Sequence, residues 1–220
     1  MSGIKIITPP EFEQITLAEA RLHLRLDDDG DSPAVHPDDP WLTGVGIPAA
    51  REYCEGWLGR ALAPQTIELA LDSFTAPIHA EWSGCTLSWP ASQTRIPLPM
   101  PPVPSVTSVK YYDASGDNTL ATSAYHFDDY DPAIVLVDGT SWPTTSVRPN
   151  AVRIRYRAGY SLPGESPDTN PLPIALKAAM LLVLGALYEN RENAAADQLT
   201  DIPLGAQALM MPYRVRLAMA

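Results

Sequence analysis

The sequence predicts an α+β fold, in which both ends of the chain build a helical unit and an antiparallel β domain is inserted between them. Apolar residues recur at helical spacing near both ends, whereas between residues 65 and 160 they alternate with polar residues, as in half-buried strands. The chain also has 23 prolines among 220 residues, about twice the usual share, and prolines favour turns and extended edges over a single helical bundle. We therefore expect N-terminal helices in residues 1–64, the β domain in 65–160, and a C-terminal helix with a tail in 161–220.

A short helix is expected near the N-terminus. Thr16 followed by Glu19 matches the capping-box pattern, and apolar residues continue at helical spacing through Leu26. The stretch Asp27–Asp31 then ends the helix, because it is too charged and too rich in turn-forming residues to continue it.

A second helix is expected from Asp39 to Gly59. Asp39 and Pro40 suit the N-cap and the first helical position, and Gly59 suits the cap at the C-terminal end. Pro48 lies within this segment. Because proline lacks a backbone N–H and its ring clashes with the preceding turn, we expect a kink or a break near Pro48.

The strand pattern of the β domain begins at Gln65. The expected strands are residues 65–72, 106–112, 125–128, 133–137 and 151–156. Turn-forming clusters at residues 113–116 and 138–139 separate some of them. Residues 96–104 hold five prolines, which suits an extended edge or polyproline segment rather than a central strand.

Helical character returns after the β domain. A helix from Pro173 to Arg191 is apolar nearly all round in its middle turns, so it needs burial on every side, either beneath the rest of the chain or against a neighbouring subunit. A last segment, Pro203–Leu217, is expected to be helical until Pro212 ends it.

The net charge of −11 is unevenly placed, since residues 1–150 hold 20 acidic against 8 basic side chains. This balance disfavours a dedicated nucleic-acid-binding module, which would need cations to neutralise phosphates. An acidic face would suit a channel through which DNA passes without binding, provided that the chain forms a ring. The longest apolar run, Ala178–Tyr188, is 11 residues long, so we expect no membrane span and a soluble protein made in the cytoplasm.

Motifs for catalysis or metal binding are missing from the sequence, so we expect no enzyme, no metal and no cofactor. Asp27–Asp31 resembles the start of a calcium loop, but the glycine is misplaced and the twelfth position is Asp38, so a solvated loop is the simpler interpretation. Asp128, Asp129 and Asp131 are interpreted as a turn between strands rather than as a catalytic pair.

The histidines, cysteines and tryptophans give no clear site. Neither metal-ligand spacing nor a CxxC motif links His23, His36, His79, His126, Cys54 and Cys85, and both cysteines are expected to be reduced. Trp57 is expected in the core, whereas Trp82 and Trp89 suit either the core or a binding surface.

Ten short stretches, in this order and spacing, are typical of one family. They are Ile15–Ala20, Leu22–Arg25, Ala49–Glu55, Gly59–Leu62, Gln65–Thr66, Pro102–Tyr112, Trp142–Pro143, Arg148–Tyr160, Leu187–Glu192 and Pro203–Arg214. Together they resemble the head-tail connector, or head-completion adaptor, proteins of tailed bacteriophages and gene transfer agents. The chain departs from that pattern in a longer loop at residues 31–38 and at Pro48.

The resemblance implies a structural adaptor of the virion neck. Such proteins form a ring, commonly of twelve copies, between the portal protein and the stopper or tail-completion protein; they stabilise the packaged head and provide the surface for tail attachment. DNA would pass through the lumen without specific binding, and no membrane is involved. The alternatives are another neck component, either a stopper or a tail-completion protein, or a particle-associated enzyme that uses the aspartate clusters.

The resemblance also implies two sets of contact residues. The C-terminal segment would reach the portal through Leu209, Met210, Pro212, Tyr213 and Arg214. The residues nearer the interface between subunits would be Tyr188, Arg191 and Glu192.

Overall fold

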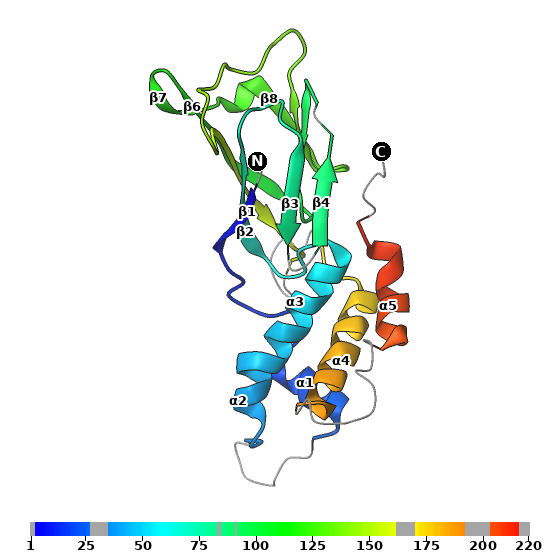
Figure 1. The fold of residues 1–220 in the computed structure, drawn as a ribbon. Coiled ribbons are helices and arrows are strands. Elements are labelled where there is room, and N and C mark those ends of the chain that lie inside the picture. The colour runs from blue at the N-terminus through cyan, green and yellow to red at the C-terminus, as the bar shows by residue number, and fades with distance from the viewer. Residues whose placement is uncertain are drawn as a thin grey trace.

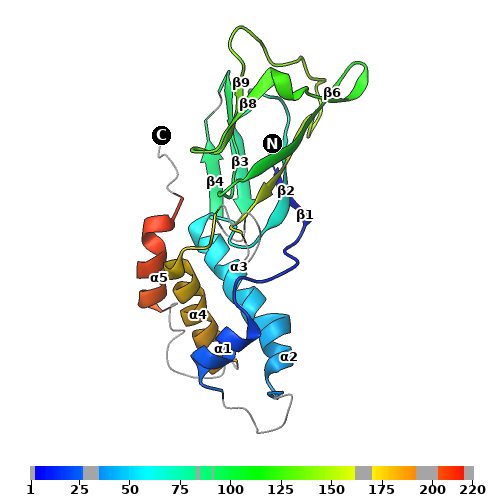
Figure 2. The same cartoon turned by 180° about the vertical axis from the view of Figure 1, so that it is seen from behind.

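The computed structural model describes residues 3–26, 35–82, 85–90, 92–161, 170–191 and 203–215, and for residues 79–88 it describes the backbone alone. The molecule is elongated, with a β unit at one end and a helical unit at the other (Figures 1 and 2). Helices and antiparallel sheets are both present, so the predicted α+β class is confirmed.

The helical unit contains segments from both parts of the chain. Its elements are α1 (Leu17–Leu24), α2 (Asp39–Trp41), a π turn (Leu42–Gly46), α3 (Ile47–Leu58), α4 (Ile174–Glu189), α5 (Leu204–Met210) and a 3-10 turn (Met211–Tyr213). The capping box of α1 is confirmed, because Thr16 accepts from the backbone of Glu19 and the Glu19 carboxylate accepts from the backbone of Thr16. Gly59 caps α3 in the left-handed conformation, as predicted.

The β unit has a five-stranded sheet in the order β1-β2-β10-β6-β7, with every pairing antiparallel. Its strands are β1 (Gly3–Thr8), β2 (Gln65–Leu71), β10 (Val152–Ala158), β6 (Ser105–Asp113) and β7 (Gly116–Thr119). A three-stranded sheet, β5-β9-β8, consists of β5 (Arg95–Pro97), β9 (Ala133–Leu136) and β8 (Tyr125–Asp128). A hairpin of β3 (Ile78–Trp82) and β4 (Cys85–Trp89) completes the unit, together with the 3-10 turn Thr122–Ala124.

All five predicted strands are present, but β1, β3, β4 and β7 were not predicted. β1 pairs with β2, so that Ile4 lies opposite Leu69 although 65 residues separate them. The proline-rich segment does contribute an edge strand, because β5 pairs with β9 alone. The pairing of residues 3–8 with the sheet shows that the helices of the predicted segment 1–64 follow a strand that belongs to the β unit.

Each of the two units has its own apolar core. One lies between the two larger sheets and includes alternate residues of β2 and β10, such as Ile67, Leu69 and Tyr156. Tyr156 is fully buried and its hydroxyl donates to the Pro99 carbonyl at 2.9 Å. The other core lies among the helices and includes Leu58 of α3 and Leu184 of α4.

The expected irregularity near Pro48 is a π turn rather than a break. Ile47 donates its N–H to the carbonyl of Leu42, five residues earlier, and helical geometry continues into α3. This wider turn directly precedes Pro48, which has no N–H to donate and sits in the first turn of α3. Gly46 lies inside the turn, where a side chain would be 2.6 Å from the Trp41 ring and 3.0 Å from Leu184.

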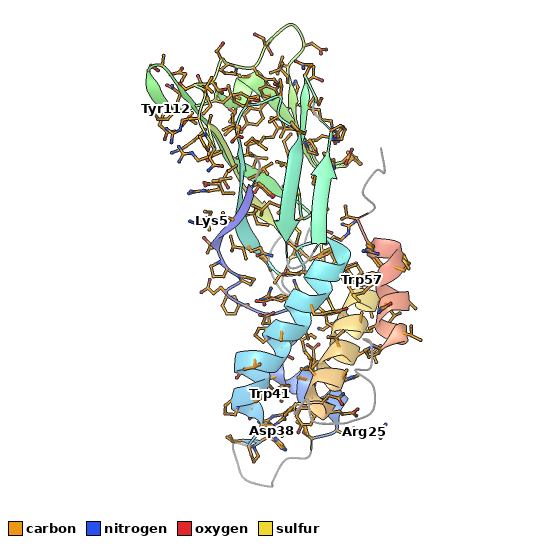
Figure 3. The ribbon with its side chains drawn as sticks, in the orientation of Figure 1. Lys5, Arg25, Asp38, Trp41, Trp57 and Tyr112 are labelled. Atoms are coloured by element: carbon orange, nitrogen blue, oxygen red, sulfur yellow. The ribbon has the colours of Figure 1, made fainter. Side chains whose placement is uncertain are left out.

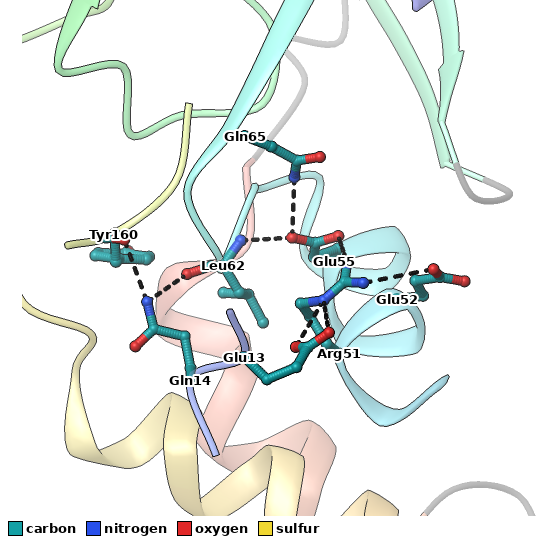
Figure 4. A network of polar contacts seen from close by, with 8 residues as sticks. All are labelled: Glu13, Gln14, Arg51, Glu52, Glu55, Leu62, Gln65 and Tyr160. Carbon is teal, nitrogen blue, oxygen red and sulfur yellow. Dashed lines mark hydrogen bonds and ion pairs between the residues drawn. The ribbon is translucent and has the colours of Figure 1, made fainter. Parts of the chain in front are cut away.

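A buried polar network joins the two units (Figure 4). The carboxylate of Glu55, on α3, is 1% exposed and accepts from the Leu62 N–H at 2.7 Å, the Gln65 amide at 3.2 Å and Arg51 at 2.9 Å. Arg51 also binds Glu13 at 2.9 Å, which attaches the segment between β1 and α1 to the same site. Burial raises the pKa of Glu55 to about 6, against the lowering effect of Arg51 and the Leu62 N–H.

A second polar contact ties the end of β10 to this junction. The side-chain amide of Gln14 lies within hydrogen-bonding distance of three carbonyls, those of Leu62 at 3.1 Å and of Tyr160 and Ser161 at 3.2 Å. Gly159 has φ +106°, and a Cβ there would lie 2.1 Å from the Ala63 carbonyl oxygen. The link that follows α3 and the link that follows β10 therefore touch each other, and glycine is required at the contact.

We expect Gly46→Ala to destabilise the protein by about 1 to 3 kcal/mol, because the new methyl group would clash with Trp41 and Leu184. Gly44→Ala is the matched control, since it lies in the same turn and a methyl group there meets nothing within 4 Å. The control should be neutral or slightly stabilising, because alanine favours helix. Urea unfolding of both variants measures the difference, and equal stabilities would contradict the packing described.

We expect the stability difference between wild type and Glu55→Gln to depend on pH. Between pH 4.5 and 6 the folded protein holds a proton on Glu55 that the unfolded chain has released, so raising the pH favours unfolding. The wild-type free energy of unfolding, relative to the variant, should fall by on the order of 2 kcal/mol across this interval. Urea titrations at several pH values test this, and a relative stability that rises with pH would contradict it.

Candidate interaction surfaces

The aspartate cluster after β8 is a capped, solvent-exposed turn, as predicted. The Asp128 carboxylate accepts from the backbone N–H groups of Tyr130 at 3.1 Å and Asp131 at 3.3 Å. Arg95 forms ion pairs with Asp131 and, at 3.7 Å, with Asp128. Asp129 and Asp131 are exposed and Asp128 is partly exposed, so these carboxylates remain hydrated and their geometry does not suit acid-base catalysis. The Asp27–Asp31 cluster lies outside the described residues.

Other chemically active side chains are dispersed in the described part of the chain. No three of its His, Cys, Asp or Glu side chains come together to hold a metal ion. Cys54 is buried, and burial raises the pKa of its thiol to about 12, so this thiol is unreactive. The side chains of Cys85, His79 and Trp82 belong to the segment 79–88, for which the structure describes the backbone alone. No helix in the described ranges is both long and apolar enough to span a bilayer.

His23, His36 and His126 occupy three different settings. His23 is exposed on α1 and His126 is exposed on β8. His36 accepts from the Asp38 N–H at 3.1 Å just before α2. Trp57 packs partly buried against the helical core and Trp89 packs against the core of the β unit, so both serve packing in this structure.

The C-terminal segment is docked along the helical unit, with α5 beside α4 (Figures 1 and 2). Val215 donates its N–H to the Leu58 carbonyl at 2.9 Å, and the Arg60 guanidinium donates to the carbonyl of Tyr213. The guanidinium of Arg214 lies 4.7 Å from the centre of the Trp57 ring. These contacts fix the tail against the end of α3.

The residues expected to reach the portal have different exposures in this segment. Pro212 and Arg214 are exposed, and Leu209 and Tyr213 are half-buried against the helical core. Met210 is fully buried, because the helical repeat of α5 turns it toward the core next to Ala206. Met210 therefore anchors the tail and offers no surface to a second chain in this conformation.

Tyr188 and Arg191, expected near a subunit interface, have partners within the chain. Arg191 binds Asp38 at 2.8 Å and lies over the rings of Trp41 at 4.3 Å and Tyr188 at 4.1 Å. The Tyr188 hydroxyl donates to the same aspartate, and these two bonds lower the pKa of Asp38 to about 2. The cluster joins the end of α4 to the start of α2 (Figure 3). Glu192 lies outside the described residues.

The helical unit leaves several large apolar side chains in solvent. Ile174 at the start of α4 is 85% exposed, Leu22 on α1 is 81% exposed and Leu204 on α5 is 81% exposed. Phe12 and Met211 are exposed by 61% and 53%. The chain's own elements thus bury one side of α4 but leave its first residue uncovered, although the sequence of α4 favours burial all round.

Chains from gene transfer agent particles share this fold. One belongs to the virion of a native gene transfer agent particle and has a TM-score of 0.70, 24% identity, and coverage of 99% of this chain and 98% of that chain. Two others have TM-scores of 0.68 with the same identity and coverage, and belong to the neck of an empty particle computed with C6 symmetry and the neck of a native particle computed with C12 symmetry. No protein-family model and no curated protein matches the chain.

A groove of about 850 Å³ lies where the β unit meets the C-terminal segment. Its walls include the proline run 101–104, the turn Asp129–Pro132, Arg60, Pro212 and Arg214. Two of the residues expected to contact a partner therefore border a hollow in the surface.

We expect Met210→Ala to destabilise the protein by about 2 to 5 kcal/mol, because it leaves a cavity under α5. Met211→Ala is the matched control, since its side chain is 53% exposed, and it should change stability by less than about 0.5 kcal/mol. Limited proteolysis should also release the C-terminal segment sooner in Met210→Ala than in the control. Equal cleavage rates would show that Met210 does not anchor the tail.

Proposed function

We propose that this chain is a head-tail adaptor of a tailed phage or phage-like particle. In this role it forms a ring, with twelve copies as the proposed number, between the portal and the stopper or tail-completion protein. The observation that carries the proposal is the fold similarity, which spans nearly the whole of this chain and of chains from gene transfer agent necks. The C12 symmetry of one of those necks supports the copy number.

The surfaces of the described residues suit a protein that makes interfaces rather than catalyses a reaction. Exposed apolar side chains on α1, α4 and α5 provide area for contact with other subunits. The described carboxylates and histidines do not converge on a desolvated site. We therefore propose a structural role without catalytic residue, metal or cofactor, located in the virion neck after synthesis in the host cytoplasm.

The C-terminal tail is the proposed contact with the portal. Pro212 and Arg214 are exposed at its end, Leu209 and Tyr213 are half-exposed beside them, and Met210 secures the segment from below. Tyr188 and Arg191 are proposed to lie near the neighbouring subunit while their internal bonds to Asp38 hold the end of α4 in place. The acidic balance of the chain suits a lumen that lets DNA pass without binding it.

Imaging of particles that carry a label on this protein tests the proposal. The expected result is a density at the single vertex between head and tail. A label found on the capsid surface or along the tail would contradict the adaptor role. Co-purification distinguishes the adaptor from the other neck components, because a stopper or tail-completion protein would bind isolated tails and would not bind portal rings.

We expect Pro212→Ser combined with Arg214→Glu to weaken binding to isolated portal rings by about tenfold or more, because both exposed contacts are removed. Arg25→Glu is the matched control, since Arg25 is exposed at the opposite end of the helical unit from Trp57 (Figure 3). Sedimentation of the purified chain with portal rings measures both. If only the Arg25→Glu control loses binding, the portal contact lies at the other end of the helical unit and the proposed contact is wrong.

A further inference from the structure

The outward face of the five-stranded sheet is cationic. Along β2 and β10 every second side chain points to the core, so the intervening residues face outward, and directly opposed residues on paired strands share one face. In the pairing register Lys5 lies opposite Glu68, Glu68 opposite Arg155, and Arg153 opposite Lys110. The cations of this sheet face are Lys5, Lys110, Arg153, Arg155 and Arg157.

This face keeps a positive charge after its internal ion pairs are counted. Glu68 binds Arg155 at 2.9 Å and Asp117 binds Arg153, and Lys5 and Lys110 add two further cations to the same face. Lys5 and Lys110 are both exposed, and Figure 3 shows Lys5 on the outer side of the sheet. The chain as a whole has a net charge of −11, so this face is opposite in sign to the rest of the molecule.

The acidic turn Asp128–Asp131 lies on the other side of the β unit. It joins β8 to β9 in the three-stranded sheet, which packs across the core from the cationic sheet. The groove places Asp129–Pro132 beside the C-terminal tail. Figures 1 and 2 both show α5 on one side of the molecule and β1 and β6 on the other.

Tyr130 makes this turn a suitable anchor. Its side chain is 96% exposed between Asp129 and Asp131, and the Asp128 carboxylate holds the backbone of the turn in place. Arg95 offsets part of the charge, so the turn remains acidic. Exposed tyrosines between charged neighbours suit an arginine-rich surface, because guanidinium groups stack on aromatic rings and bind carboxylates.

We propose that the cationic sheet face binds the Asp128–Asp131 turn of a second copy of this chain. This inference rests on the proposed function, which supplies neighbouring copies in a ring. Because the two surfaces lie on opposite sides of one molecule, each copy presents one surface to the copy before it and the other to the copy after it. Such head-to-tail contacts form a ring when the rotation between successive copies closes, and the proposed neck ring requires that closure.

A nucleic acid is the competing occupant of the cationic face, and the observations favour the protein. The chain's net charge of −11 repels a polyanion at long range. The face already holds two carboxylates, Glu68 and Asp117, which would lie next to phosphates. The acidic turn instead carries only a few carboxylates together with the exposed ring of Tyr130. This combination is complementary to a face on which cations outnumber carboxylates.

Zero-length cross-linking with a carbodiimide tests the contact, because this reagent joins a lysine amine to a carboxylate that touches it. The chain has only three lysines, and Lys5 and Lys110 are both on the cationic face. Lys177 binds Glu19 at 2.5 Å within the chain and serves as the internal control for the reagent. The reaction is run on purified particles and on the purified full-length chain at high concentration.

The expected products are links from Lys5 or Lys110 to Asp129 or Asp131, identified by mass spectrometry, in species of two or more chain masses. Asp129→Asn combined with Tyr130→Ala should lower their yield about tenfold, with the Lys177–Glu19 link unchanged. Asp138→Asn, which removes an exposed carboxylate from another loop, is the matched control and should leave the yield unchanged.

Two outcomes would overturn the inference. One is a strong Lys177–Glu19 link with no link from Lys5 or Lys110 to the turn in either sample. The other is binding of a labelled DNA duplex that Lys110→Glu abolishes, again without those links, which would identify the face as a nucleic-acid site. The imaging experiment tests the adaptor role separately. If the labelled protein is found in the neck and either of these outcomes occurs, the contact is refuted and the adaptor role stands. If the label is found elsewhere and the cross-links form, the adaptor role is refuted and the contact stands.

Discussion

The buried carboxylate of Glu55 is the constraint on which the arrangement of the two units depends. A charge without water or partners costs several kcal/mol, so the chain around it must supply donors. Arg51, the Leu62 N–H and Gln65 supply them, and they come from α3, from the link after it and from the first residue of β2. Satisfying one carboxylate therefore fixes how the helical unit passes into the sheet.

The same junction fixes the other chain crossings. Arg51 also binds Glu13, and the neighbouring Gln14 binds the carbonyls that follow β10, so the N-terminal segment is held against both passages. Gly159 permits the two passages to touch at the Ala63 carbonyl. Each unit has its own apolar core, and directional polar bonds, rather than one continuous core, set the elongated shape in Figure 1.

An elongated subunit with two cores exposes much surface, and its chemistry is divided among distinct regions. The helical unit exposes apolar side chains and a tail secured by Met210, whereas the β unit separates positive and negative surfaces on opposite sides. Apolar area supplies affinity and charge supplies orientation. A subunit built in this way is suited to fixed neighbours in an assembly, and this agrees with the neck location proposed from fold similarity.

Local patterns in the sequence determined the fold class, the capping box at Thr16, an irregularity near Pro48 and five strands, because periodicity, caps and proline effects depend on neighbouring residues. The tertiary structure alone decided the remainder. β1 was missed because its partner lies about 65 residues away, and the burial of Met210 was not evident from the sequence because it depends on how α5 docks. The internal partners of Arg191 and the opposed charges of the β unit likewise arise from residues distant in the chain, whose proximity no local pattern encodes.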